Sequence, residues 1–118
     1  MQSKPWPSEW LRGVLALAVM RVLVDGPTYG YAIGVELEEH GFGVLKGGTL
    51  YPLLSRLEEA GHVTVEWRAG DGGPARKYFA LTAEGHDEFV RAAREWSEFA
   101  QLTTTFTSTR PAAPAATA

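Results

Sequence analysis

Cationic and hydroxyl-bearing side chains recur between residues 46 and 77, at spacings that suit the binding of a nucleic acid. An arginine can fork onto a guanine edge or a phosphate, and serine and threonine hydroxyls can bond to either. A tyrosine offers its hydroxyl to a phosphate and its ring to a thymine methyl group. The candidate DNA contacts are Lys46, Thr49, Tyr51, Pro52, Ser55, Arg56, Arg68, Arg76 and Lys77.

The charge balance of the same stretch limits this interpretation. The 118-residue chain carries a formal net charge of −3, and residues 46–77 hold five positive and four negative side chains. Phosphate neutralisation by lysine and arginine supplies most non-specific DNA affinity, so an acidic protein needs a locally cationic surface. Taken singly, each arginine is more simply a solvated surface charge. The DNA-binding prediction therefore depends on elements that bring these cations together.

Other chemistries find little support in the sequence. The absence of cysteine excludes disulfides, thiolate zinc sites and thiol catalysis. His40, His62 and His86 lack the paired spacing of a metal site. The glutamate clusters have no candidate nucleophile beside them, and the glycine-rich segments fit neither a P-loop nor a dinucleotide fingerprint. We therefore expect no catalytic residue, no metal and no cofactor, and a protein that is not an enzyme.

The spacing of apolar residues predicts a mainly α-helical chain with a small β-hairpin. The expected elements are a helix over residues 8–24 capped by Ser8 and a second that starts at 28–30 and ends at about 40. A third follows over 47–61 with Pro52 near its first turn, then strands at 63–68 and 77–81, and a fourth helix opened by Thr82. Along the first strand, Val63, Val65 and Trp67 are expected to share a buried face.

Three helices followed by a hairpin are the layout of a winged helix-turn-helix domain. In that layout the third helix enters the major groove and the hairpin loop touches flanking backbone. We expect the DNA-binding domain over residues 8–82, a C-terminal dimerisation helix over 83–106 and a disordered tail over 107–118.

Three blocks of the sequence resemble the PadR family of transcriptional regulators. They are GPTYGY (26–31), GGTLYPLLSRLEEAG (47–61) and GGPARKYFALTAEG (72–85), within a similarity over about residues 11–86. The resemblance implies a winged-helix dimer that usually represses, with the helix from Thr49 on DNA and with Tyr51 and Arg76 among its contacts. The chain departs from the family pattern where Lys46 and Gly47 stand in place of a capping serine or threonine.

An apolar stripe along the fourth helix follows the alternating three- and four-residue steps of a coiled-coil seam. Such a stripe needs a partner, and the same helix of a second subunit supplies it most simply, which predicts a two-fold homodimer. The resemblance implies the same for short family members with one C-terminal helix. The expected interface residues are Trp6, Trp10, Phe89, Ala92, Trp96, Phe99, Thr103 and Phe106.

Two interpretations of these aromatic residues stay open. They form a plain interface core, as aromatic residues often do, or they leave a pocket for a planar aromatic effector between two copies of Trp96. The resemblance implies the second for some short family members. The predicted function is a repressor released by a small molecule; the alternative is a ligand-sequestering or protein-interaction dimer on a winged-helix scaffold.

We also expect a cytoplasmic protein. The longest apolar stretch, residues 14–24, contains Arg21 and is about half as long as the roughly 20 residues that cross a bilayer. Near the N-terminus, Pro5 and Pro7 interrupt any signal-peptide core. The sequence therefore predicts neither a membrane span nor a secretory signal.

Overall fold

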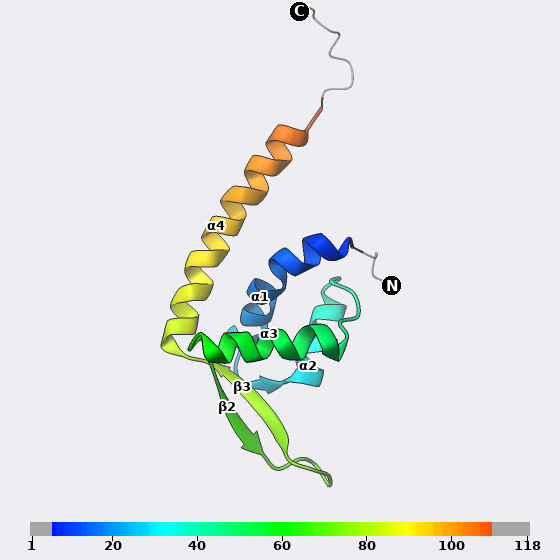
Figure 1. The fold of residues 1–118 in the computed structure, drawn as a ribbon, viewed down its shortest axis with the longest axis vertical. Helices are drawn as coiled ribbons and strands as arrows, with labels where there is room; N and C mark the ends of the chain where they lie inside the picture. Colours follow the sequence, from blue (N-terminus) through cyan, green and yellow to red (C-terminus); the bar gives the residue numbers. More distant parts are fainter. Residues whose placement is uncertain (1–5, 110–118) are drawn as a thin grey trace, which may run out of the picture.

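A computed structural model describes residues 6–109, which form helices packed on a small antiparallel sheet (Figure 1). The elements in chain order are α1 (Ser8–Val24), β1 (Thr28–Tyr29), α2 (Gly30–Glu39), α3 (Gly47–Glu59), β2 (Val63–Arg68), β3 (Arg76–Leu81) and α4 (Ala83–Thr107).

The core lies where α1, α2 and α3 meet the base of the sheet. Val19 of α1, Ile33 of α2 and Leu54 of α3 are almost completely buried. Val63 of β2 and Phe79 of β3 complete the core from the side of the sheet. Burying a side chain of this size stabilises a fold by about 1.5–3 kcal/mol. These contacts fix α3 against the rest of the domain.

The sheet has three strands in the order β1-β3-β2, one more than the predicted hairpin. Thr28 and Tyr29 pair with Phe79 and Tyr78 of β3, so α2 begins at Gly30, at the end of the predicted start range 28–30. The sequence signal for β1 was weak because a two-residue strand has no periodicity. The long hairpin formed by β2 and β3 projects from the helices as the wing (Figure 1).

Two local predictions about helix starts are wrong. Ser8 is the first residue of α1, and the N-cap is Pro7, whose carbonyl accepts a hydrogen bond from the Trp10 amide at 3.0 Å. Proline is tolerated at this position because the first backbone amides of a helix have no hydrogen-bond partner within the helix, so its missing N–H costs little. Pro52 is the sixth residue of α3, beyond the first turn, and it cannot donate to the carbonyl of Gly48.

α4 begins as the sequence predicts, with Thr82 as its N-cap. The Thr82 hydroxyl accepts from the Gly85 amide at 2.9 Å and donates to the Gly61 carbonyl at 2.7 Å. The helix continues to Thr107, and its last turns extend beyond α1 and the rest of the domain (Figure 1). Residues 110–118 of the predicted tail lie outside the described residues.

The order of three helices, a hairpin wing and a long C-terminal helix is that of a winged-helix domain with an added helix. No helix among residues 6–109 is both long enough and apolar enough to span a bilayer.

Candidate DNA interface and dimer seam

α3 turns a polar face away from the core. Its buried side is formed by Leu50, Leu53, Leu54 and Leu57. With 3.6 residues per turn, Tyr51 and Arg56 lie on opposite flanks of the outward face, and Pro52 and Ser55 lie between them. All four are exposed. This is the geometry that a recognition helix needs, because side chains on both flanks can reach base edges or backbone.

A groove of about 300 Å³ separates α1 from α3 and gathers cations. Lys46, Thr49 and Arg56 line one side, and Arg12 of α1 lines the other. Arg12, Lys46 and Arg56 are exposed, and none forms an ion pair within residues 6–109. Sequence reasoning missed Arg12, although its neighbour Leu11 lies on the core side of α1 and indicates an outward position.

Lys46 is the N-cap of α3, and its side chain makes no capping hydrogen bond. Its backbone carbonyl accepts from the amides of Thr49 and Leu50 at 2.9 and 3.0 Å. The helix therefore starts without a serine or threonine cap, and the position carries a cation instead.

Each wing arginine lies over the ring of a tyrosine, and the two tyrosines are neighbours with tilted rings. Arg76 lies over the ring of Tyr29 at 4.6 Å, and Arg68 lies over Tyr78 at 4.3 Å; the two tyrosine rings are 5.4 Å apart. Arg68 also approaches Glu66, with Nε 3.4 Å from a carboxylate oxygen. Arg76 forms no ion pair within the described part of the chain. Arg76 is therefore better placed than Arg68 to neutralise a phosphate.

Lys77 and Trp67 face each other across the wing in strand register. Trp67 is 65% exposed, so the predicted burial of that residue is wrong. The reason is that the hairpin projects beyond the helices at the level of Trp67 (Figure 1). Of the three alternating residues, only Val63 is fully buried. The Lys77 ammonium lies 5.5 Å from the Phe79 ring centre.

The predicted seam on α4 divides into two parts. Phe89 is partly buried and packs against the core of its own chain. Trp96 and Phe99 are 40% and 58% exposed, with ring centres 5.9 Å apart. Phe106 at the far end is 85% exposed, and Leu102, which the predicted seam left out, is 64% exposed.

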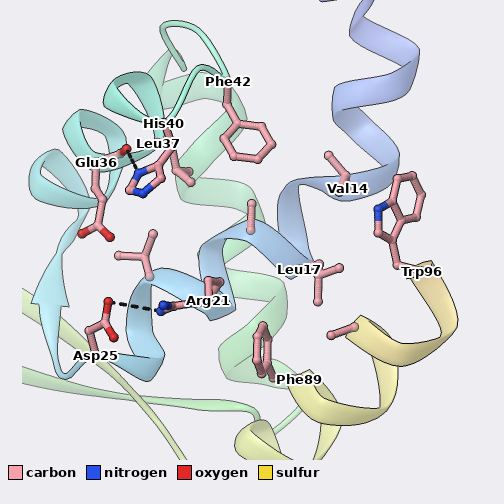
Figure 2. Close-up of a pocket in the computed structure, with 13 residues that line it drawn as sticks. Val14, Leu17, Arg21, Asp25, Glu36, Leu37, His40, Phe42, Phe89 and Trp96 are labelled. Carbon is pink, nitrogen blue, oxygen red and sulfur yellow. Dashed lines mark hydrogen bonds and ion pairs between the residues drawn. The ribbon is translucent and has the colours of Figure 1, made fainter. Parts of the chain in front are cut away.

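Two apolar grooves lie beside this helix. The first, of about 640 Å³, is bounded by α1, α2 and α4 (Figure 2). Phe42, Phe89 and Trp96 line it, and the Arg21–Asp25 ion pair, with 3.1 Å between its charged atoms, lies at its edge.

The second groove, of about 550 Å³, is lined by Trp6, Trp10, Trp96, Phe99 and Thr103. The Trp6 indole donates to the Gly41 carbonyl at 2.8 Å. The Thr103 hydroxyl donates to the Phe99 carbonyl at 2.9 Å. The second groove thus brings five of the eight predicted seam residues together, while Phe89 lines the first groove and neither Ala92 nor Phe106 lines either.

The pKa shifts of this chain belong to an ion-pair network on α4, away from the cations of α3 and the wing. Arg91 donates to Glu88 at 2.6 and 3.0 Å and to Glu95 at 2.7 Å. These hydrogen bonds lower the pKa of Glu88 and raise the pKa of Arg91. Because the pKa of Glu88 is depressed, its contribution to stability is present above the ordinary glutamate pKa and is lost as pH falls below it.

Among the described residues, no group of three or more histidines, cysteines, aspartates or glutamates is placed to hold a metal ion.

A helix with an exposed polar face, beside a wing that carries cations, is the arrangement through which winged-helix proteins bind DNA, and the fold assigns the chain to this class. The model of the Transcriptional regulator PadR-like family matches residues 19–91, and the chain belongs to that family. It is therefore a DNA-binding transcription regulator and not an enzyme.

Individual relatives agree with this assignment. Transcriptional regulator Rv3488 of Mycobacterium tuberculosis is 33% identical over 93 residues, which cover 79% of this chain and 85% of that protein. A PadR family transcriptional regulator from Eggerthella lenta has a similar solved structure, with 33% identity, a TM-score of 0.77 and coverage of 86% of this chain and 88% of the other. A PadR-like transcriptional regulator from Bacillus cereus has 25% identity and a TM-score of 0.76, over 86% of this chain and 99% of the other.

Proposed function

We propose that the chain is a homodimeric, sequence-specific repressor that acts on operator DNA in the cytoplasm and is released by a small-molecule effector. The observation that carries this proposal is the outward face of α3. Tyr51, Ser55 and Arg56 are exposed there while the leucines are buried, so the helix can enter a major groove without loss of the core. The wing cations Arg76 and Lys77 would then contact the flanking backbone.

The dimer follows from the apolar surface of α4. Phe99, Leu102 and Phe106 are largely exposed along a helix whose last turns extend beyond α1 (Figure 1). The same helix of a second copy would cover them with an identical stripe, as a two-fold interface requires. Two copies of α3 would then occupy successive major grooves about 34 Å apart on a near-palindromic site.

The second groove is the candidate effector site. Its aromatic lining suits a planar aromatic molecule, and Trp96 and Phe99 come from the helix that would form the dimer. A ligand that prefers one separation of the two domains over another would shift DNA affinity. The alternative, a solid aromatic interface without a ligand, predicts that no member of a varied panel of aromatic compounds changes tryptophan fluorescence.

The test of the function is a fluorescence anisotropy titration against the region upstream of the chain's own gene, with a scrambled duplex as control and with salt varied. We expect preference for the upstream duplex by about a thousand-fold or more. Weak and equal binding to both duplexes would favour either a distant operator or a dimer that sequesters a ligand. Binding selection from a random duplex pool separates the two, because only a regulator enriches a sequence.

A further inference from the structure

The ring of Tyr51 lies in a narrow space formed by two glycines, which we call the Tyr51 slot. A Cβ placed on Gly30 of α2 would lie 2.6 Å from the tyrosine Oη and 2.7 Å from Cε1. On the other edge of the ring, a Cβ on Gly47 would lie 3.4 Å from Cδ2. The first separation is impossible for real atoms, and the second is an ordinary contact. Gly30 is therefore the residue whose missing side chain makes room for this phenol.

Backbone conformation does not explain a glycine at position 30. The positive φ angles of this chain occur at other glycines, and Gly30 is the first residue of helix α2. Alanine is a better helix former than glycine, so the backbone alone would favour alanine at this position. The close approach of Tyr51 is the remaining structural reason for a glycine.

The slot leaves the tyrosine hydroxyl available to a ligand. Tyr51 is 50% exposed, and its hydroxyl makes no hydrogen bond within residues 6–109. It is held beside the start of α2, where Tyr29, the N-cap, makes no side-chain capping bond. A phenol fixed in one orientation loses less conformational entropy on binding than a mobile one.

We propose that Gly30 is a positioning residue for DNA binding: its missing side chain lets the Tyr51 ring lie against α2, where the hydroxyl meets a backbone phosphate. This inference rests on the proposed function. A methyl group on residue 30 meets the flexible end of a side chain, so it displaces the ring and leaves the main chain in place. A groove of about 230 Å³ between α2 and α3, lined by Val35 and Val44 among others, gives the displaced ring space.

The test is a double-mutant cycle of Gly30→Ala and Tyr51→Ala. Affinity is measured by anisotropy with a fluorescein-labelled duplex recovered by binding selection with the wild-type chain. Gly30→Ala is expected to weaken binding about tenfold, the value of one hydrogen bond to a charged group. In the Tyr51→Ala background the same substitution is expected to change affinity less than twofold. The matched control is Gly34→Ala on the same helix, where a Cβ meets nothing within 4 Å and affinity should stay within twofold.

Thermal melts of each variant separate positioning from folding. Gly30→Ala is expected to melt within a few degrees of the wild type. Wild-type-like DNA affinity for Gly30→Ala, or an equal loss in both backgrounds, would overturn the inference. The inference would also be overturned if the Gly30→Ala protein is unfolded and stays unfolded when Tyr51→Ala is added. The glycine would then be required by the backbone and not by the tyrosine ring. If the wild type enriches no duplex at all, the proposed function itself fails, and that outcome is distinct from the others.

Discussion

Arg56 and Lys77 carry the same charge but are expected to contact different parts of DNA. Arg56 is exposed on α3, where a guanidinium can donate to both acceptors on the edge of a guanine. Lys77 belongs to β3 in the wing, and we expect its ammonium to contact the sugar-phosphate backbone, which is the same in every sequence. The two residues should therefore differ in specificity and not only in affinity.

Replacing Arg56 with alanine is expected to cost about 1–3 kcal/mol on the preferred duplex and to relax base preference at one position. Replacing Lys77 with alanine is expected to weaken binding to all duplexes to a similar extent and to reduce the salt dependence by about one unit of slope. Anisotropy titrations against the preferred duplex and its single-base variants at several salt concentrations measure both effects. Equal, sequence-independent losses for the two variants would show that Arg56 contacts only phosphate.

The sequence predicted the outward residues of α3 because the four buried leucines determine the direction of every other side chain on a helix. It could not show that Arg12 joins Lys46 and Arg56 on one groove, because that depends on how α1 packs against α3. The pairing of Arg68 with Glu66 was equally hidden, since both were counted only as charges. The direction of side chains on a helix was predictable, but contacts that depend on packing between elements or on the rotamers of neighbouring side chains were not.

At the scale of elements, Thr82 joins α4 to the rest of the domain. Its hydroxyl caps α4 and donates to Gly61, and its amide donates to the His62 carbonyl at 3.0 Å. Gly61 and His62 form the turn that follows α3. Thr82 therefore links the start of α4 to the turn that follows α3. The sequence predicted the cap, because threonine is favoured there, but not the bond to Gly61.

Thr82→Ala is expected to lower the free energy of unfolding by about 2 kcal/mol, roughly 1 kcal/mol each for the cap and for the bond to Gly61. Thr82→Ser retains both hydrogen bonds and should stay near the wild type. Thr107→Ala is a second control, because that hydroxyl bonds only within α4 and the residue is not among the predicted interface residues. Urea denaturation at a fixed protein concentration measures the shift in midpoint. Equal stability of the alanine and serine variants at position 82 would contradict this role.

At the scale of the whole molecule, α4 serves both its own chain and the expected partner. The heptad pattern predicted one continuous stripe, yet Phe89 packs on the core of its own chain while Phe106 is nearly free. A periodic pattern shows which side chains share a face and not what covers that face. The domain lies beside α4 as far as the second groove, and the last turns of the helix extend beyond it (Figure 1). We therefore expect a partner to cover the exposed apolar residues towards the end of the helix, including Leu102.

Leu102→Glu tests that assignment without disturbing the domain, because residue 102 is exposed and far from the core. Loss of the leucine from an interface costs about 2 kcal/mol, so the dimer dissociation constant should rise more than tenfold. Gln101→Glu is the matched control: it adds the same charge one residue away, at an exposed position turned by about 100° around α4. Sedimentation velocity over a range of protein concentrations measures both, with circular dichroism to confirm that the helices persist. A Leu102→Glu protein that dimerises like the wild type, or a Gln101→Glu protein that dissociates as readily, would place the interface elsewhere on the molecule.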